Sequence, residues 1–352
     1  MRRKSRKIKV GRLYIGGDAP VTVQSMTNTD TTNIKETIKQ INDLEEIGCE
    51  VIRVSAPTIE AAKALKEIKK NINIPLVADI HFDYRIAIEA AKYADKLRIN
   101  PGNIGKEDKI KLVVNAAKEQ GIPIRIGVNL GSLEKDIFDK YGYTTEAMVE
   151  SALRHVKILE GLGFYDMVVS LKASDVNTMI NANRLFSKKT EYPMHLGVTE
   201  AGSKLPGTIK NSIGLGVLLS EGIGDTIRVS LSEDPKEEVK VGKQILRSLG
   251  LKKDGVEVTS CPTCARANID VIKISEEIEN KTEKIKKPIH VAIMGCAVNG
   301  PGECKKADIG VVGGSNNDNL FYKNGEIVGK IAEEKIVESL LKEIEKMTKK
   351  II

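Results

Sequence analysis

Three cysteines stand in two short motifs near the carboxyl end of the sequence, and their spacing is typical of a metal site. Cys261 and Cys264 form a C-x₂-C pair, and Cys296 follows in a loop rich in glycine and proline that ends at Cys304. Thiolates at C-x₂-C spacing bind one soft metal centre, either zinc or an iron–sulfur cluster. The spacing alone does not separate a zinc ion held by four cysteines from a cluster held by three cysteines and another ligand.

A second set of residues that could do chemistry is cationic and repeats through the first two thirds of the chain. Four segments share the pattern apolar–Arg–apolar–small, at Arg53, Arg98, Arg125 and Arg228, and Lys172 has a comparable setting. Side chains alternate between the two faces of a β-strand, so each arginine shares a face with the small residue. Buried together, these cations would repel one another and lose hydration. We therefore expect an anionic ligand, and phosphate or diphosphate suits the planar fork of arginine.

Few carboxylates lie on the same segments to neutralise these cations. Asp79 and Glu200 are the obvious ones, with His81 two residues after Asp79 and Thr199 directly before Glu200. A simpler interpretation pairs each arginine with a carboxylate from a neighbouring loop, but the repetition of the pattern favours a ligand. Glu200 is open to two roles, a general acid or an arginine partner. The remaining candidates are interpreted as structural: His155, His195, His290 and Cys49.

The elements that must position these residues alternate between short β-like runs and helical patterns. The runs are 21–26, 51–56, 75–80, 96–101, 123–129, 167–174, 194–202 and 225–232. This alternation predicts a (β/α)₈ TIM barrel, in which active sites lie at the carboxyl ends of the strands, where the cations fall. A doubly wound open sheet is the rival fold. It should carry a glycine-rich phosphate motif after an early strand, and this sequence has none there.

The composition changes after these runs. A charged helical segment at 236–254 leads into a shorter α/β pattern with strands at 290–294 and 307–312. Asn324-Gly325 signals a hairpin, and a final amphipathic helix spans 336–347. We therefore expect two domains, a barrel at 1–245 and a smaller metal-binding domain at 256–352, joined by a linker at 246–255.

Composition excludes several classes of protein. The 352 residues are 41% hydrophobic and 29% charged, which is typical of a globular protein rather than a disordered one. The net charge of +7 is spread along the chain and aromatic residues make up only 4%, so we expect no nucleic-acid binding. A basic run at 2–9 is interpreted as a solvated arm, because no apolar segment of a signal peptide follows. Without a long apolar stretch, and with an odd number of cysteines, we expect a cytoplasmic protein with no membrane span.

Three longer motifs give the chain a resemblance to a known enzyme family. They are Gln24-Ser-Met-Thr-Asn-Thr29, Ser260-Cys-Pro-Thr-Cys264 and Met294-Gly-Cys-Ala-Val-Asn-Gly-Pro-Gly-Glu303. Over essentially its whole length the sequence resembles the 4-hydroxy-3-methylbut-2-enyl diphosphate synthase family in its short bacterial two-domain form. The resemblance implies a TIM barrel joined to a smaller reductase-like domain that carries a [4Fe–4S] cluster.

The resemblance also implies an activity, partners and site residues. The family opens the ring of 2-C-methyl-D-erythritol 2,4-cyclodiphosphate and removes a hydroxyl as water, in the methylerythritol phosphate route to isoprenoids. Flavodoxin or ferredoxin supplies two electrons, and the family works as a homodimer whose active sites are shared between chains. Matched residue by residue, the cluster ligands are Cys261, Cys264, Cys296 and Glu303. The matched substrate contacts are Arg53, Asp79, His81, Arg98, Asn100, Arg125, Asn129, Lys172, Arg228 and Ser230, with Glu200, beside Thr199, as the catalytic acid.

One residue departs from the family pattern. Cys304 directly follows Glu303, where a small residue that binds no metal is expected, and it could replace Glu303 as the fourth ligand. Adjacent side chains in an extended loop point in opposite directions, so only one of the two should reach the metal, and we favour Glu303. Two other functions stay open. One is a barrel lyase or transferase for a phosphorylated substrate with a structural zinc site, and the other is a binding protein whose zinc-ribbon tail contacts nucleic acid.

Overall fold

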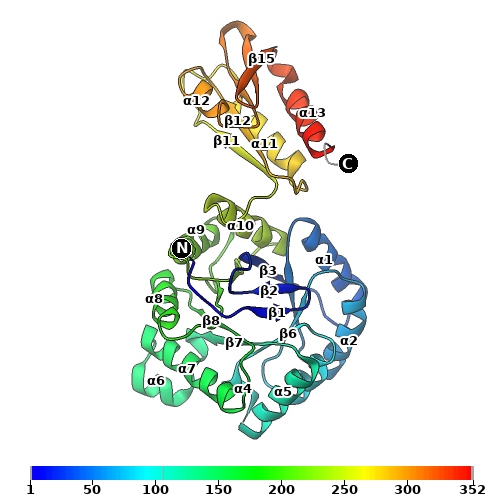
Figure 1. The fold of residues 1–352 in the computed structure, drawn as a ribbon, viewed down its shortest axis with the longest axis vertical. Coiled ribbons are helices and arrows are strands. Elements are labelled where there is room, and N and C mark those ends of the chain that lie inside the picture. Colours follow the sequence, from blue (N-terminus) through cyan, green and yellow to red (C-terminus); the bar gives the residue numbers. More distant parts are fainter. Residues whose placement is uncertain (1, 106, 350–352) are drawn as a thin grey trace. The chain divides into compact units, whose positions relative to one another are not determined.

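A computed structural model of the chain describes residues 2–105 and 107–349 (Figure 1). The chain divides into two compact units, Met1–Lys252 and Lys253–Ile352. Each unit has its own apolar core. Among the residues described, no helix combines the length and the apolar character that a membrane crossing requires.

The first unit is built around a closed barrel of parallel strands. Its sheet has eight strands in the order β8-β7-β6-β5-β4-β3-β10-β9, and a bridge between Val169 and Met194 joins its two ends. The strands are β3 (Thr22–Met26), β4 (Val51–Ser55), β5 (Leu76–Asp79), β6 (Lys96–Ile99), β7 (Ile124–Asn129), β8 (Met167–Lys172), β9 (His195–Leu196) and β10 (Thr226–Ile227). The predicted (β/α)₈ fold is confirmed. β9 and β10 are shorter than predicted, because single bonds such as Thr199 N–H to Ala173 O replace a regular ladder there.

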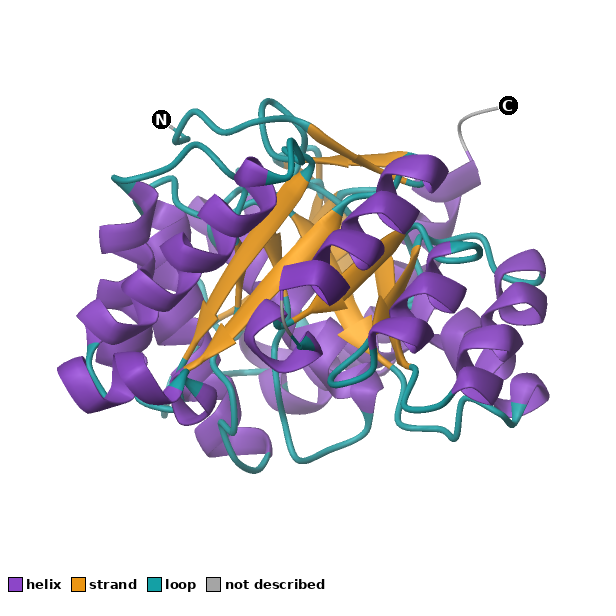
Figure 2. Cartoon of the chain, turned by 90° about the horizontal axis from the view of Figure 1, so that it is seen from below, coloured by secondary structure: helices purple, strands orange, loops and turns teal. Residues whose placement is uncertain are grey.

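Helices surround the barrel and cover the outer face of its strands (Figure 2). Outward-facing residues such as Ile52, Leu97 and Ile126 pack with the helices in one continuous core. Polar side chains cap the first turn of several of these helices. For example, the Thr58 side chain accepts a hydrogen bond from the Ala61 N–H and so caps α2. The helices are α1 (Ile34–Glu46), α2 (Ile59–Lys70), α3 (Tyr84–Ala91), α4 (Pro101–Ile104), α5 (Glu107–Gln120), α6 (Lys135–Tyr141), α7 (Thr145–Gly161), α8 (Val176–Ser187), α9 (Lys204–Ser220) and α10 (Pro235–Ser248), with a 3₁₀ turn η1 at Leu130–Ser132.

The amino-terminal segment is only in part the solvated basic arm that its composition predicts: Lys4, Arg6, Lys7 and Lys9 are exposed, but Arg2 and Arg3 are half-buried. It contains a hairpin of β1 (Ile8–Val10) and β2 (Leu13–Ile15), whose apolar side chains pack on Val168 of β8. Arg2 forms a 2.9 Å ion pair with the buried carboxylate of Asp225. The prediction was wrong for Arg2 because the partner of this arginine lies more than two hundred residues away in the sequence.

The second unit is a five-stranded sheet in the order β11-β12-β13-β14-β15. The first three strands are parallel, and β14 and β15 form the hairpin predicted at Asn324-Gly325. Its elements are β11 (Val256–Ser260), α11 (Val271–Thr282), β12 (Ile289–Met294), α12 (Gly300–Cys304), β13 (Ile309–Val312), η2 (Ser315–Asn317), β14 (Asn319–Lys323), β15 (Glu326–Ile331), η3 (Glu333–Lys335) and α13 (Ile336–Lys349).

The two faces of this sheet are covered by different helices. Val291 and Ile293 of β12 pack in a core that includes residues of α11 and α13. Their neighbours Ala292 and Met294 point to the other face and pack with Cys304 of α12. The alternation of β12 therefore places the cysteine-rich loop and α12 away from the main core of the domain.

Candidate functional site

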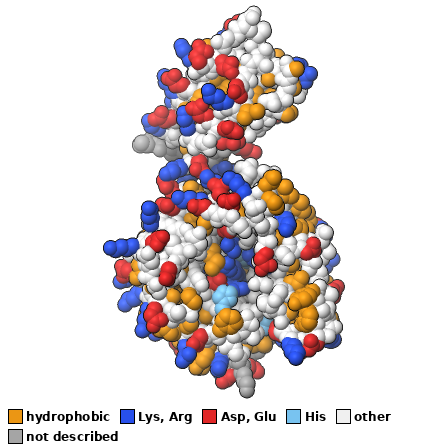
Figure 3. Space-filling view, turned by 180° about the vertical axis from the view of Figure 1, so that it is seen from behind, with side chains coloured by type: hydrophobic (Ala, Val, Ile, Leu, Met, Phe, Trp, Pro, Cys, Tyr) orange, Lys and Arg blue, Asp and Glu red, His pale blue; other side chains and the backbone are white. Residues whose placement is uncertain are grey.

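The cations of the repeated strand pattern lie inside the barrel, at paired register positions of adjacent strands. The strand register sets Arg98 of β6 between Asp79 of β5 and Arg125 of β7. It also sets Asn129 beside Lys172 at the ends of β7 and β8. Figure 3 shows a hollow in this unit with Lys and Arg side chains at its base. Arg53, Arg98, Arg125 and Lys172 are buried and Arg228 is half-buried, in agreement with the prediction that strand parity turns these cations inward.

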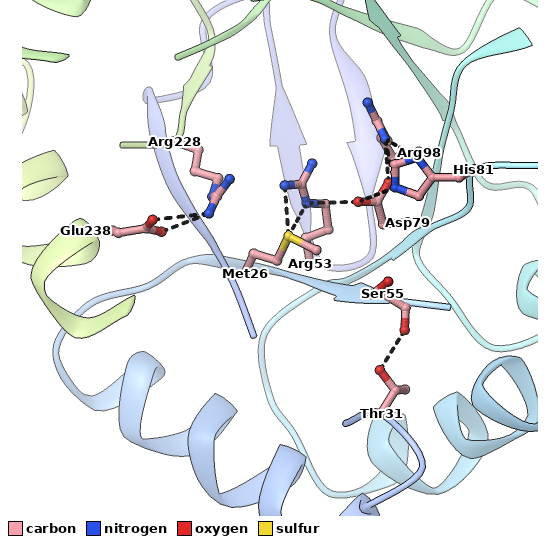
Figure 4. Close-up of polar contacts among 9 residues, drawn as sticks. All are labelled: Met26, Thr31, Arg53, Ser55, Asp79, His81, Arg98, Arg228 and Glu238. Atoms are coloured by element: carbon pink, nitrogen blue, oxygen red, sulfur yellow. Dashed lines mark hydrogen bonds and ion pairs between the residues drawn. The ribbon is translucent and has the colours of Figure 1, made fainter. Parts of the chain in front are cut away.

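Asp79 stands at the centre of the cationic group (Figure 4). Its Oδ1 lies 2.9 Å from Arg98 Nη1, and its Oδ2 lies 3.6 Å from Arg53 Nε and 3.5 Å from His81 Nε2. Burial alone would raise the pKa of this carboxyl, but Arg53, the hydrogen bond from His81 and Arg98 lower it far below its usual range. Gly127 makes room for this arrangement, because a Cβ there would come within 2.7 Å of Arg98 Nε. Asp79 is therefore an ionised partner of two arginines.

A second carboxylate, Glu238 of α10, was missed by sequence reasoning. Both of its oxygens lie 3.2 Å from Arg228 Nη2 (Figure 4), and one also accepts a bond from Leu231 N–H. Glu238 lies on the helix that follows the last barrel strand. It is therefore outside the strand patterns from which the site residues were predicted. The sulfur of Met26 was missed as well, and it lies 2.9 Å from Arg53 Nη2. The simpler interpretation, in which arginines pair with carboxylates, thus holds for part of the site.

Three further cations lie in the barrel without such a partner. Arg125, Lys172 and Lys96 are buried, and no hydrogen bond or ion pair to a carboxylate is found for them within residues 2–105 and 107–349. Burial, and after it the nearby arginines, lower the pKa of Lys172 and of Lys96 well below the ordinary lysine value. Lys96 was not predicted, although its alternation with Arg98 on β6 was a usable signal. A group of cations that exceeds its carboxylates is suited to bind an anion.

The other predicted residues lie at the carboxyl ends of the barrel strands. Asn100 follows β6, and its side chain accepts a bond from Gly102 N–H at the start of α4. Ser230 follows β10, and its carbonyl accepts a bond from the Asn211 side chain. Glu200 is exposed and has a φ of 51°, a left-handed conformation that is strained for a residue with a Cβ. Such strain is often kept at functional sites, which favours the predicted role of this residue.

In the second unit, the strand ends bring the cysteine motifs to one edge of the sheet. β11 and β12 are parallel neighbours, with Ser260 paired to Ile293, so Cys261 and Cys296 both follow the carboxyl ends of adjacent strands. The N–H of Gly295 lies 3.1 Å from the sulfur of Cys261. Cys264 is exposed, and all five cysteines are free thiols. We call the carboxyl ends of β11 and β12, where these cysteines lie, the open edge of the sheet. Thiol sulfurs at this edge, with the Gly295 N–H directed at one of them, fit an iron–sulfur cluster.

Glu303 and Cys304 differ sharply in their surroundings. The Cys304 side chain is fully buried, and its sulfur faces the carbonyls of Ala292 and Val311 inside the domain. Glu303 is 39% exposed and lies 3.5 Å from Lys306. Cys304 is therefore turned away from the open edge, which favours Glu303 as the fourth ligand.

Comparison with protein families covers both units. The GcpE TIM-barrel domain matches residues 5–243, and the GcpE protein C-terminal domain matches residues 257–346. The chain belongs to the GcpE family. Relatives within it are named 4-hydroxy-3-methylbut-2-en-1-yl diphosphate synthase (flavodoxin). The protein from Caldanaerobacter subterraneus subsp. tengcongensis is 62% identical over 99% of both chains. The protein from Clostridium acetobutylicum is 59% identical over 98% of this chain and 99% of its own.

Solved structures resemble this GcpE chain in fold alone. An N-acetylneuraminic acid synthetase from Leptospira borgpetersenii has a TM-score of 0.53 at 15% identity, with 80% of this chain and 98% of that chain covered. A type I 3-dehydroquinate dehydratase from Clostridium difficile has a TM-score of 0.52 at 15% identity, with 70% and 98% covered. At such identities the likeness supports the barrel architecture and carries no information on activity.

Proposed function

We propose that this GcpE chain is a 4-hydroxy-3-methylbut-2-en-1-yl diphosphate synthase of the methylerythritol phosphate pathway. The observation that carries the proposal is its identity of 62% and 59%, over nearly the full length of both chains, with relatives of that name. In the reaction, a ring carbon–oxygen bond of 2-C-methyl-D-erythritol 2,4-cyclodiphosphate breaks and a hydroxyl leaves as water. Two electrons and two protons balance the conversion to the linear enyl diphosphate.

The barrel domain, 1–245, binds the cyclodiphosphate in this proposal. Support comes from Arg125 and Lys172, which are buried without carboxylate partners in the region described and so lack a counter-charge. A diphosphate supplies that charge, and bidentate arginine contacts fix its orientation. The proposed contacts are Arg53, Asp79, His81, Arg98, Asn100, Arg125, Asn129, Lys172, Arg228 and Ser230.

Glu200 is the proposed acid, with Thr199 beside it. Its carboxyl group gives the proton with which the hydroxyl leaves as water. The exposure of this side chain and the left-handed backbone at Glu200 support the assignment. Asp79 is a poor candidate for the same role, because its two arginine partners keep its carboxyl ionised.

The smaller domain, 256–352, is the proposed site of a [4Fe–4S] cluster held by Cys261, Cys264, Cys296 and Glu303. When bound there, the cluster would pass the two electrons of the reaction, one at a time, from the external donor to the substrate. The bond from Gly295 N–H to the Cys261 sulfur would stabilise the charge of that thiolate. The burial of Cys304 supports its exclusion from the ligand set.

We extend the proposal to the partners of the enzyme. Flavodoxin is the proposed electron donor, since relatives carry it in their names, and ferredoxin is the alternative. The enzyme works as a homodimer with active sites shared between chains, as the sequence resemblance implies. The cytoplasm is the proposed compartment, because free thiols and a cluster need reducing conditions.

A turnover experiment tests the activity. The anaerobically purified chain is mixed with the cyclodiphosphate and reduced flavodoxin, and the products are identified by mass spectrometry. We expect the linear enyl diphosphate, with two electrons consumed for each product molecule. A product that forms without any reductant would overturn the proposal in favour of a barrel lyase. No product from a chain with a full cluster would also contradict it.

A further inference from the structure

A pair formed by a buried histidine and a half-buried glutamate lies beside the barrel mouth and has no role in the proposed chemistry. Oε1 of Glu134 lies 2.8 Å from Nε2 of His155, and its other oxygen accepts a 2.7 Å bond from the Ser151 hydroxyl. Glu134 directly precedes α6, whereas Ser151 and His155 belong to α7. His155 is only 2% exposed. Sequence reasoning interpreted this histidine as structural because it stands in a helical pattern, and it did not identify Glu134 as its partner.

The pair lies close to the segment that carries a proposed substrate contact. Gly102, in α4, lies so close that a Cβ there would be 3.3 Å from Cγ of Glu134 and 3.4 Å from Cε1 of His155. The same glycine N–H donates a 3.2 Å bond to Oδ1 of Asn100. His155 and Glu134 therefore lie next to Gly102, whose N–H is bonded to the side chain of Asn100.

The link between α6 and α7 does not depend on this pair alone. Arg154, the neighbour of His155, already links the helices through two bonds to Asp136, of 2.7 and 3.0 Å, on the exposed surface. Burial would raise the pKa of Glu134, but the hydrogen bonds from His155 and Ser151 lower it to about 2. Glu134 is therefore an ionised, half-buried carboxylate held by two side chains of α7. The exposed pair supplies a matched control, because it connects the same helices and is not among the contacts of Gly102.

We propose that Glu134 and His155 are positioning residues that hold the segment from Asn100 to Ile104 in place for substrate binding. The inference rests on the proposed function, because Asn100 is one of its proposed substrate contacts. Glu134 also starts the helix that follows β7, so the pair fixes the loops after both β6 and β7 at the mouth. A small displacement of such loops is expected to lower substrate affinity without unfolding the barrel.

The test measures the dissociation constant of the cyclodiphosphate for the full-length protein by calorimetry. We expect His155→Leu and Glu134→Leu, which both remove the pair, to weaken binding by about 10- to 100-fold. His155→Gln should retain most of the affinity, since its amide N–H can replace Nε2 as the donor to Glu134. Asp136→Asn, the control, should bind like the wild type. In turnover, KM should rise more than kcat falls, which a general loss of folded protein would not produce.

The outcomes separate this inference from the proposed function. A wild-type chain that does not bind the cyclodiphosphate contradicts the proposed function itself. Wild-type binding together with unchanged affinity in His155→Leu overturns the positioning role alone. Should His155→Leu fail to fold, Gly102→Ala addresses the same place, because its Cβ would lie 3.3 Å from Cγ of Glu134 and 3.4 Å from Cε1 of His155 and would press the segment and the pair apart by a few tenths of an ångström. Unchanged affinity in Gly102→Ala would then overturn the inference.

Discussion

Nη1 of Arg98 lies 2.9 Å from Oδ1 of Asp79 in a buried ion pair, and the other carboxylate oxygen of Asp79 faces Arg53. One carboxylate thus holds two arginines together inside the barrel. The remaining cations, Arg125 and Lys172, have no comparable partner in the described residues. The site therefore combines a paired part, which supports the fold, with an unpaired part that is suited to an anion.

Removal of the Asp79 charge should destabilise the protein. Asp79→Asn leaves two buried arginines without their partner, and the loss of one member of a buried ion pair costs about 3–5 kcal/mol. We expect the free energy of unfolding, measured in urea, to fall by about that amount. Asp136→Asn, which breaks an exposed pair with Arg154, should cost less than about 1 kcal/mol. Equal effects of the two substitutions would contradict the role of Asp79.

Arg125 should affect stability and binding in opposite directions. Arg125→Met removes a buried cation that lacks a carboxylate, so we expect the ligand-free protein to become more stable to urea by about 1 kcal/mol or more. The same change should weaken cyclodiphosphate binding by about 10-fold or more, because a charge-assisted bond to phosphate is lost. Arg154→Met, at an exposed arginine, is the control. Reduced stability together with unchanged affinity would assign Arg125 a structural role instead.

Much of this barrel site was predictable from local sequence, because strand parity is a local property. The alternation in β4, β6 and β7 predicted that Arg53, Arg98 and Arg125 share the inner face of the barrel. Glu238 was not predictable in this way, since it reaches Arg228 from a helix outside the strand pattern. The Glu134–His155 pair was missed for the same reason, because a contact between two helices leaves no periodic mark in the sequence.

Glu303 and Cys304 should respond differently to substitution. Glu303→Ala removes the proposed cluster ligand from the open edge, so we expect a folded protein that has lost turnover. Cys304→Ala alters only a buried side chain and should retain both the cluster and turnover. Iron analysis, circular dichroism and the turnover assay measure these effects. Near-normal turnover in Glu303→Ala, or loss of the cluster in Cys304→Ala, would reverse the assignment.

Thiol reactivity should distinguish the two kinds of cysteine. Burial raises the pKa of Cys304 and of Cys49 to about 12, so each stays a protonated, unreactive thiol at pH 8. In chain stripped of metal, iodoacetamide should label Cys261, Cys264 and Cys296 and leave the other two unmodified. The labelled cysteines are identified by mass spectrometry of peptides. The control is the urea-unfolded chain, in which all five cysteines should react. Fast labelling of Cys304 in the folded chain would show that it can reach the open edge.

The identity of the metal centre tests the account most directly. The chain is purified without oxygen, and iron, sulfide and zinc are measured on the same sample together with the visible spectrum. We predict a brown protein with about four iron and four sulfide per chain, as a cluster held by Cys261, Cys264, Cys296 and Glu303 requires. A colourless protein with one tightly bound zinc would contradict the account, and the cations of the barrel would then serve a reaction without electron transfer.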